Sequence, residues 1–171
     1  MNNSSKNIVL IGMAGVGKTT VGRVLSKKIQ RKFLDMDQEF EDQTKIRITD
    51  FFAIYGEKEF RKIERRIIND VLTKNKKLVV SAGGGIFSND EIRDLIIKKS
   101  DTFFLDSSIK TLTERLKKNF INRPLLNKGN LGDNIEKLYD KRIKNYMMAK
   151  HIILVDELSV EDVVLNIIKR I

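Results

Sequence analysis

Hydrophobic positions along the chain follow two kinds of pattern. Short apolar runs without alternation predict strands buried on both faces, and apolar residues recurring every three or four positions predict amphipathic helices. The strands are expected at residues 7–11, 33–35, 78–80, 102–105 and 151–155. The helices are expected at residues 19–29, 38–44, 49–54, 57–72, 89–97, 109–117, 131–149 and 160–170. This alternation is typical of an α/β fold with a parallel sheet.

No repeat, low-complexity tract or linker interrupts the pattern, so residues 1–171 are expected to form a single domain. Residues 119–130 are polar, include the one proline of the chain and predict a mobile loop. The longest apolar runs, 8–11 and 152–155, are far shorter than a membrane span or the apolar core of a signal peptide. These features favour a cytoplasmic protein without a membrane partner.

Composition then narrows the chemistry. The chain has no Cys and a single His, His151, which argues against a thiol nucleophile, a zinc site or histidine acid–base catalysis. Lys plus Arg number 33 against 23 Asp plus Glu, a net charge of +10. The basic residues are spread over polar helix faces without interleaved aromatic residues, so no nucleic-acid partner is expected. The charge suits a small ligand rich in phosphate.

Residues 12–20, GMAGVGKTT, match the phosphate-binding pattern G-x-x-x-x-G-K-[ST] between a predicted buried strand and a predicted helix. Backbone N–H groups of such a loop surround a phosphate at the start of a helix. Lys18 is expected to reach the β- and γ-phosphates, and the Thr19 hydroxyl to coordinate Mg²⁺. The expected ATP contacts in this segment are Gly15, Val16, Gly17, Lys18, Thr19 and Thr20.

Two carboxylates, Asp35 and Asp37, follow the second predicted strand, at the edge where open α/β sheets bind ligands. A carboxylate there can hold a metal-bound water or accept a proton from a substrate hydroxyl. The alternative interpretation is an ordinary polar loop or helix cap.

Other candidate residues are ambiguous when taken alone. Arg61 lies at the edge of the apolar stripe of its helix, where it can cover apolar surface or present a fork to a carboxylate or phosphate. Three consecutive glycines, 83–85, end the third predicted strand, as a tight turn or as a place where a ligand approaches the backbone. Arg123 in the polar loop can close over ATP or be solvated. Arg142 and Tyr146 share one helix face.

In this order along residues 7–170, the motifs resemble those of the shikimate kinases of aromatic amino-acid biosynthesis. The phosphate-binding loop by itself indicates only a nucleotide, whereas the remaining motifs together are specific. They are Phe33-x-Asp35-x-Asp37, Gly56-Glu57-x-x-Phe60-Arg61-x-x-Glu64, Gly83-Gly84-Gly85, Arg123-Pro124-Leu125-Leu126 and Arg142-x-x-x-Tyr146-x-x-Ala149.

The resemblance implies a three-layer P-loop kinase fold similar to that of the nucleoside-monophosphate kinases. Its five-stranded parallel sheet has the order 2-3-1-4-5 and is flanked by helices, with a lid at about residues 119–130. The implied enzyme is a transferase that moves the γ-phosphoryl group of ATP to the 3-hydroxyl of shikimate, giving 3-phosphoshikimate and ADP. Its partners are these small molecules and Mg²⁺, and a monomer is expected.

The resemblance also implies a role for each candidate residue. Asp37, Lys18 and Arg123 are the implied catalytic residues. The implied shikimate contacts are Asp37, Arg61, Gly83, Gly84, Gly85 and Arg142, with the two arginines on the carboxylate. Arg115 and Arg123 are implied to contact ATP, Thr19 to bind Mg²⁺ directly and Asp35 to bind it through water.

Two alternatives stay open at this point. One is a related small-molecule kinase that acts on gluconate or a nucleoside monophosphate, although no base-recognition pocket for a nucleotide acceptor is evident. The other is a basic nucleotide- or RNA-binding protein without catalysis, against which the full set of Lys18, Asp37, Arg61, Arg123 and Arg142 argues. An assay of ADP release with different acceptors separates them.

Overall fold

The centre of the protein is a parallel sheet of five strands. The computed structural model describes residues 5–118 and 130–171. Within them the strands are β1 (Asn7–Ile11), β2 (Phe33–Asp35), β3 (Val79–Ser81), β4 (Ser100–Asp106) and β5 (His151–Leu154). Their order is β2-β3-β1-β4-β5, which confirms the predicted 2-3-1-4-5 sheet. All five residues of β1 are buried, as expected of the central strand of a sheet covered on both faces.

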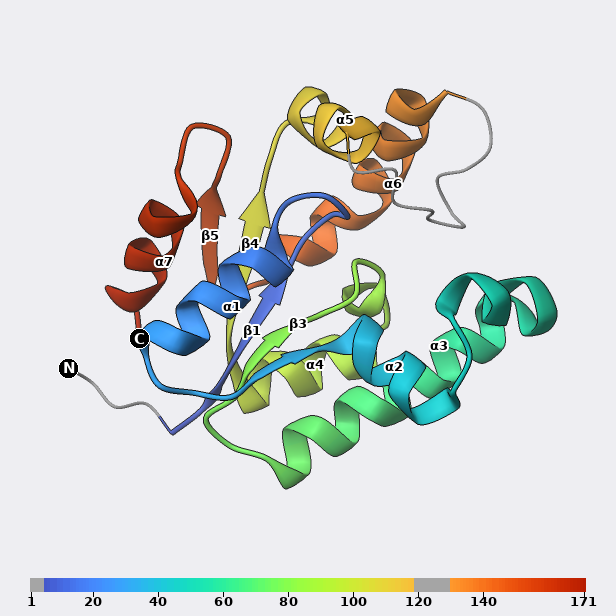
Figure 1. Ribbon diagram of the computed structural model, residues 1–171, viewed down its shortest axis with the longest axis horizontal. Helices are drawn as coiled ribbons and strands as arrows, with labels where there is room; N and C mark the ends of the chain where they lie inside the picture. Colours follow the sequence, from blue (N-terminus) through green and yellow to red (C-terminus); the bar gives the residue numbers. More distant parts are fainter. Residues whose placement is uncertain (1–4, 119–129) are drawn as a thin grey trace.

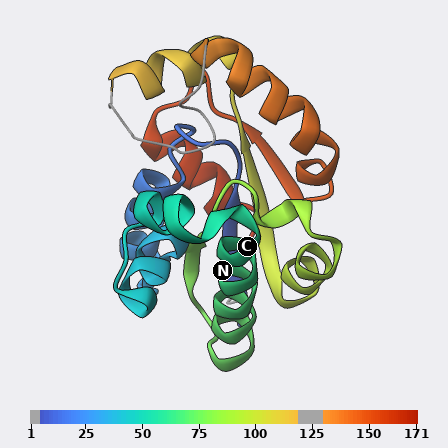
Figure 2. The same cartoon turned by 90° about the vertical axis from the view of Figure 1, so that its right-hand side faces the viewer.

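Helices cover both faces of this sheet and give the three predicted layers (Figures 1 and 2). Helices α1 and α7 pack together on one face, and α3 and α4 pack together on the other, whereas α5 lies beyond the carboxyl end of β4 beside α6. The bounds are α1 (Lys18–Lys28), α2 (Met36–Thr44), α3 (Ile48–Lys74), α4 (Asp90–Lys99), α5 (Ile109–Lys118), α6 (Leu131–Tyr146) and α7 (Val160–Ile168).

Most element boundaries differ from the sequence prediction by one to three residues, and one short helix was not predicted. Helix α2 begins at Met36 rather than residue 38, because the Asp35 side chain accepts a hydrogen bond from the Asp37 amide and caps the helix two residues earlier. A short 3₁₀ helix, η1 (Ile86–Ser88), follows the glycine triplet and was not predicted. Helix α6 ends at Tyr146, before the predicted end at residue 149, because the following turns tighten to bonds between residues three apart.

The helix pair predicted at 49–54 and 57–72 forms one helical stretch broken at Gly56. That residue has φ 76° and ψ 176°, outside the helical region, so α3 changes direction there. The bend places the first part of α3 beside α2 and leaves the longer second part against the sheet (Figure 1). Residues from both parts of α3 line the candidate site described below.

No helix in the described parts of the chain has both the length and the apolar composition that crossing a membrane requires.

The turn that leaves β1 passes close to the end of β4. Gly12 has φ 144°, and a Cβ atom there would lie 2.5 Å from the backbone oxygen of Leu105. Gly17, which caps α1, also has a positive φ, 104°, but no atom lies within 4 Å of its Cβ position. A side chain at Gly17 would therefore meet only backbone strain, whereas one at Gly12 would meet both backbone strain and steric overlap.

We expect Gly12→Ala to lower the free energy of unfolding more than Gly17→Ala does. Gly17→Ala should lower the free energy of unfolding by about 1–2 kcal/mol, because only the left-handed backbone disfavours the added Cβ atom. The Gly12 variant also forces the loop away from β4, which adds about 1–3 kcal/mol. Urea unfolding followed by circular dichroism measures both, and equal losses would contradict the close contact with Leu105.

Candidate active site

The loop between β1 and α1 surrounds the ammonium group of Lys18. The Nζ atom of Lys18 donates hydrogen bonds to the backbone oxygens of Gly12, at 2.9 Å, and Met13, at 3.0 Å. Lys18 is also the first residue of α1, so its ammonium group lies close to the positive end of the helix dipole. The loop thus combines a lysine, a helix N-terminus and backbone amides, which is the arrangement that binds phosphate groups.

Beside this loop, three strand- and helix-end residues bring their oxygen atoms together. The Thr19 hydroxyl donates to Oδ2 of Asp35 at 2.6 Å and lies 3.5 Å from the Ser81 hydroxyl. Asp35 ends β2 and Ser81 ends β3, so adjacent parallel strands deliver both side chains to the same edge. The structure therefore brings the predicted pair Thr19 and Asp35 together and adds Ser81, which the sequence analysis missed.

This oxygen set fits a hard cation that keeps most of its water. One carboxylate and two hydroxyls are typical of Mg²⁺ sites completed by water and substrate phosphates. Among residues 5–118 and 130–171, no group of three or more His, Cys, Asp or Glu side chains could enclose a metal ion. A metal here would accordingly depend on a phosphate ligand for part of its coordination.

The first turns of the long part of α3 carry a buried ion pair. Nη1 of Arg61 donates to Oε2 of Glu64 at 2.6 Å, and the side chain of Glu64 is only 4% exposed. Burial raises the pKa of Glu64 above its usual value, although the charge of Arg61 opposes the shift. Burial acts to lower the pKa of Arg61, but the carboxylates of Glu64 and Glu57 outweigh it and the pKa is raised. Arg61 is thus a fixed, permanently charged group.

The glycine triplet after β3 provides the space that these charged side chains occupy. A Cβ atom at Gly83 would lie 2.5 Å from Oε1 of Glu64, and one at Gly85 would overlap the guanidinium of Arg61. A Cβ atom at Gly84 would lie 3.3 Å from Nη1 of Arg142. The predicted close approach to this backbone therefore exists, and in the described structure the protein's own arginines and Glu64 make it.

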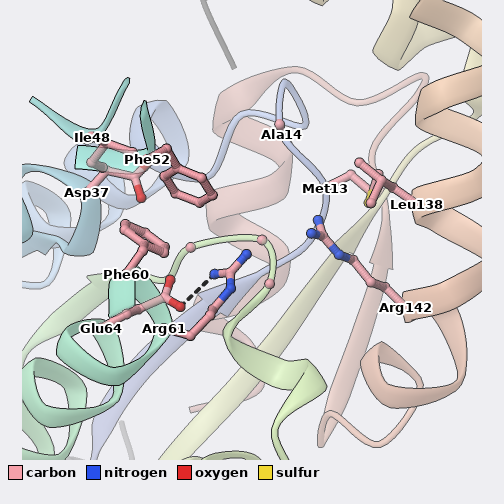
Figure 3. Close-up of a pocket in the computed structure, with 13 residues that line it drawn as sticks. Met13, Ala14, Asp37, Ile48, Phe52, Phe60, Arg61, Glu64, Leu138 and Arg142 are labelled. Atoms are coloured by element: carbon pink, nitrogen blue, oxygen red, sulfur yellow. Dashed lines mark hydrogen bonds and ion pairs between the residues drawn. The ribbon is translucent and has the colours of Figure 1, made fainter. Parts of the chain in front are cut away.

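Helix α6 brings Arg142 to the same place from the opposite side (Figure 3). Four residues further on, Tyr146 is buried and its hydroxyl donates to the backbone oxygen of Gly84. Burial raises the pKa of Tyr146, so the phenol keeps its proton and remains a donor. This contact joins the end of α6 to the glycine triplet.

Arg61, Arg142 and Asp37 face one hollow with a charged and an apolar side (Figure 3). The sequence analysis named the charged residues and the triplet but gave the apolar wall no role beyond core packing. The periodicity of apolar residues along the helices was the one available signal for this wall. That periodicity does not distinguish a residue buried in the core from one that lines a pocket. The other lining residues are Met13, Ala14, Ile48, Phe52, Phe60, Glu64 and Leu138.

A second hollow runs along the phosphate-binding loop and shares Asp37, Gly83 and Gly84 with the first. It also contains Lys18, Thr19, Asp35 and Ser81. Asp37 therefore lies where the apolar-walled hollow meets the phosphate-binding one. Any group bound beside Asp37 is next to the end of a phosphate chain held by the loop.

A third hollow lies on the other side of the loop. It shares Gly15, Gly17 and Thr20 with the second hollow and is lined by the predicted Arg115, whose Nη1 donates to the backbone oxygen of Val16 at 3.1 Å. Its apolar wall comes from the turn after β5 and the start of α7, at Val155, Leu158, Val160 and Val163. The sequence analysis missed this C-terminal wall. Arg123 and residues 119–129 of the predicted lid lie outside the described residues.

Comparisons with known proteins identify relatives over nearly the whole chain. A family model described as shikimate kinase matches residues 14–171. The shikimate kinase of Thermodesulfovibrio yellowstonii is 39% identical over 165 residues, which cover 96% of this chain and 94% of that protein. The solved structure of the Acinetobacter baumannii shikimate kinase in complex with shikimate matches with a TM-score of 0.92 at 30% identity, covering 98% of this chain and 93% of that one.

A gluconokinase from Sinorhizobium meliloti is also similar in structure. Its TM-score is 0.58 at 16% identity, over 94% of this chain and 88% of that one. Identity this low shows a shared fold and nothing about the acceptor.

We expect Arg61→Met to destabilise the protein by about 3–5 kcal/mol at neutral pH, because it leaves the Glu64 carboxylate buried without its partner. Burying a carboxyl group costs least when the group is protonated. The loss in free energy of unfolding should therefore shrink as the pH falls toward about 5 and Glu64 takes up a proton. Urea unfolding of wild type and variant at several pH values measures the difference.

The matched control is Arg61→Met combined with Glu64→Gln. The neutral amide removes the buried charge, so the double variant should recover stability at neutral pH and lose the pH dependence of the single variant. A loss for Arg61→Met that is equal at all pH values would contradict the ion-pair explanation.

Proposed function

Because the chain belongs to the shikimate kinase family and phosphorylates shikimate in the aromatic pathway, we propose that its three adjoining hollows divide the reaction between them. The apolar-walled hollow takes shikimate, the middle hollow takes the phosphates of ATP, and the third takes the adenine. The arrangement of Arg61, Arg142 and Asp37 around one hollow is the observation that carries this proposal.

The acceptor hollow matches shikimate group by group. Two guanidinium groups, Arg61 and Arg142, enter from opposite sides and suit a single carboxylate. Asp37 accepts hydrogen bonds from ring hydroxyls, and the glycine triplet lies along the ring. The apolar wall, with Phe52 and Phe60, covers the face of the ring and excludes water.

The phosphates of ATP occupy the loop that begins at Gly12. Gly15, Val16 and Gly17 supply amides, Lys18 contacts the β- and γ-phosphates, and Thr20 completes the set. Adenine lies in the third hollow between Arg115 and the wall from Val155 to Val163. The planar guanidinium of Arg115 suits stacking on an aromatic base.

Mg²⁺ is part of the proposal because the oxygen atoms of Thr19 and Asp35 fit it. Thr19 would hold the ion directly and Asp35 would hold it through water, with Ser81 close to both. When bound, the ion supplies positive charge against the phosphates. Asp35 has a second task in the protein alone, as the N-cap of α2 that fixes the position of Asp37.

Positioning and charge stabilisation carry the chemical step. Phosphoryl transfer passes through a loose transition state, so the acceptor hydroxyl needs alignment more than a strong base. Asp37 orients the 3-hydroxyl and takes its proton as the bond to phosphorus forms. Lys18 stabilises charge on the transferred group, and Arg123 is proposed to do so from the lid, although it lies outside the described residues.

The remaining expectations form part of the same proposal. Residues 1–171 act as one monomeric unit in the cytoplasm, with a lid at about residues 119–130 and without a nucleic-acid or membrane partner. The placement of the three hollows within one chain supports the monomer. Light scattering at assay concentration tests the monomer.

We expect Asp37→Asn to lower kcat for shikimate-dependent ADP release by about 10²–10⁴-fold, because the amide cannot take the proton. ATP binding should persist, whereas Lys18→Ala should weaken it. The matched control is Asp42→Asn, the same change at an exposed position of α2. Gluconate and nucleoside monophosphates serve as alternative acceptors, and ADP release with either but not with shikimate would overturn the proposed acceptor.

We expect Asp35→Asn to raise the Mg²⁺ concentration needed for half-maximal activity, since an amide holds a metal-bound water less strongly than a carboxylate. Asn is a good N-cap residue, so α2 should keep its start and the melting temperature should change little. A titration of activity with Mg²⁺ measures the effect. An unchanged Mg²⁺ requirement would argue against Asp35 as a metal-site residue.

A further inference from the structure

Arg142 lies midway between two residues of α6 that are tied to other parts of the protein. Tyr139 stands three residues before it and Asn145 three residues after it. Residues three apart are neighbours on a helix surface, so the three side chains lie along one side of α6. Neither Tyr139 nor Asn145 lines the acceptor hollow.

The first tie joins α6 to the end of β4. The hydroxyl of Tyr139 donates to Oδ1 of Asp106 at 3.1 Å, and Oδ2 of the same carboxylate is 3.4 Å away. Burial and the adjacent Asp106 carboxylate raise the pKa of Tyr139 to about 12, so the phenol keeps its proton at neutral pH. Asp106 itself accepts a hydrogen bond from the Ser107 amide at 2.9 Å, which holds it at the end of the strand.

The second tie joins the end of α6 to α4. Nη1 of Arg93 donates to the side-chain oxygen of Asn145 at 3.0 Å and to Asp90 at 2.8 Å. The Arg93 side chain is only 10% exposed, and its Nε atom has no hydrogen-bond partner among the described residues. A buried guanidinium with an unsatisfied nitrogen costs stability. Asp90, which is 82% exposed, and Asp94, which is 72% exposed and 3.9 Å from Nε, offset little of that cost.

We propose that these two ties position Arg142. They fix the rotation of α6 about its axis and its position along that axis relative to β4 and α4. The guanidinium of Arg142 is thereby directed into the acceptor hollow, across from Arg61. A substrate-binding group loses much of its effect when it is displaced by about 1 Å. The positioning residues for shikimate binding are therefore Arg93, Asp106, Tyr139 and Asn145. This inference rests on the proposed role of Arg142.

The test uses the full chain and calorimetric titration with shikimate, together with steady-state kinetics. We expect Tyr139→Phe and Asn145→Ala each to weaken shikimate binding by about 3–10-fold, the effect of one lost hydrogen bond. The KM for ATP should stay close to wild type. Asn145→Ala should also lower the melting temperature, because it removes an acceptor from the buried guanidinium of Arg93. A loss of general stability without positioning would instead change the two substrates alike.

Two matched variants sharpen the test. Asn145→Asp keeps an acceptor for Arg93 and should restore binding. Tyr55→Phe makes the same chemical change as Tyr139→Phe at a half-exposed residue of α3 outside all three hollows, and should leave binding unchanged. Failure of the Asp variant to restore binding, or an equal effect of Tyr55→Phe, would overturn the inference.

A cycle with Arg142→Met separates this inference from the proposed function. If Tyr139 acts through Arg142, then Tyr139→Phe should have no further effect on shikimate binding once Arg142 is removed. An unchanged affinity in Arg142→Met would overturn the proposed role of Arg142 itself. Two results would overturn positioning while leaving the proposed role of Arg142 intact. One is weaker shikimate binding in Arg142→Met together with normal binding in Tyr139→Phe, and the other is an additive effect of the two changes on binding.

Discussion

The buried ion pair of Arg61 and Glu64 is the interaction on which the site depends. A carboxylate that is 4% exposed is stable only with a close partner, and Arg61 provides it at 2.6 Å. The pair fits because Gly83 and Gly85 follow β3, and their missing Cβ atoms leave room for Glu64 and Arg61. The long part of α3 and the end of β3 are therefore held at one separation, and the acceptor hollow lies between them and α6.

Parallel strands then bring the rest of the chemistry to this edge of the sheet. Asp35 and Ser81 end adjacent strands and the glycine triplet follows the second of them, so residues far apart in the chain become neighbours. The same edge receives the phosphate-binding loop after β1. Asp37 links the two substrate hollows because Asp35 caps α2 and thereby sets the first turn in which Asp37 lies.

Sequence patterns were sufficient wherever a feature is local. The loop around Lys18 carries all of its chemistry within nine consecutive residues, and apolar periodicity located each strand and long helix to within a few positions. The strand order came from the family resemblance. Ser81, the aromatic wall at Phe52 and the wall from Val155 were missed, because such residues acquire a role only when distant elements meet. The early start of α2 was missed because a helix cap was considered only as an alternative to a ligand role for Asp35 and was not used to place the start of the helix.

The contacts of Arg61 also explain how a partly buried, paired arginine can still serve as an anion site. Glu64 holds Nη1 at 2.6 Å, whereas Glu57 receives Nε and Nη2 at 3.3 and 3.2 Å. Glu57 is half-exposed, and long contacts to an exposed carboxylate contribute little. The edge of the guanidinium that forms bidentate pairs is thus held weakly, while the other nitrogen is held firmly. Glu64 orients the fork, and an incoming carboxylate has only a solvated side chain to displace from it.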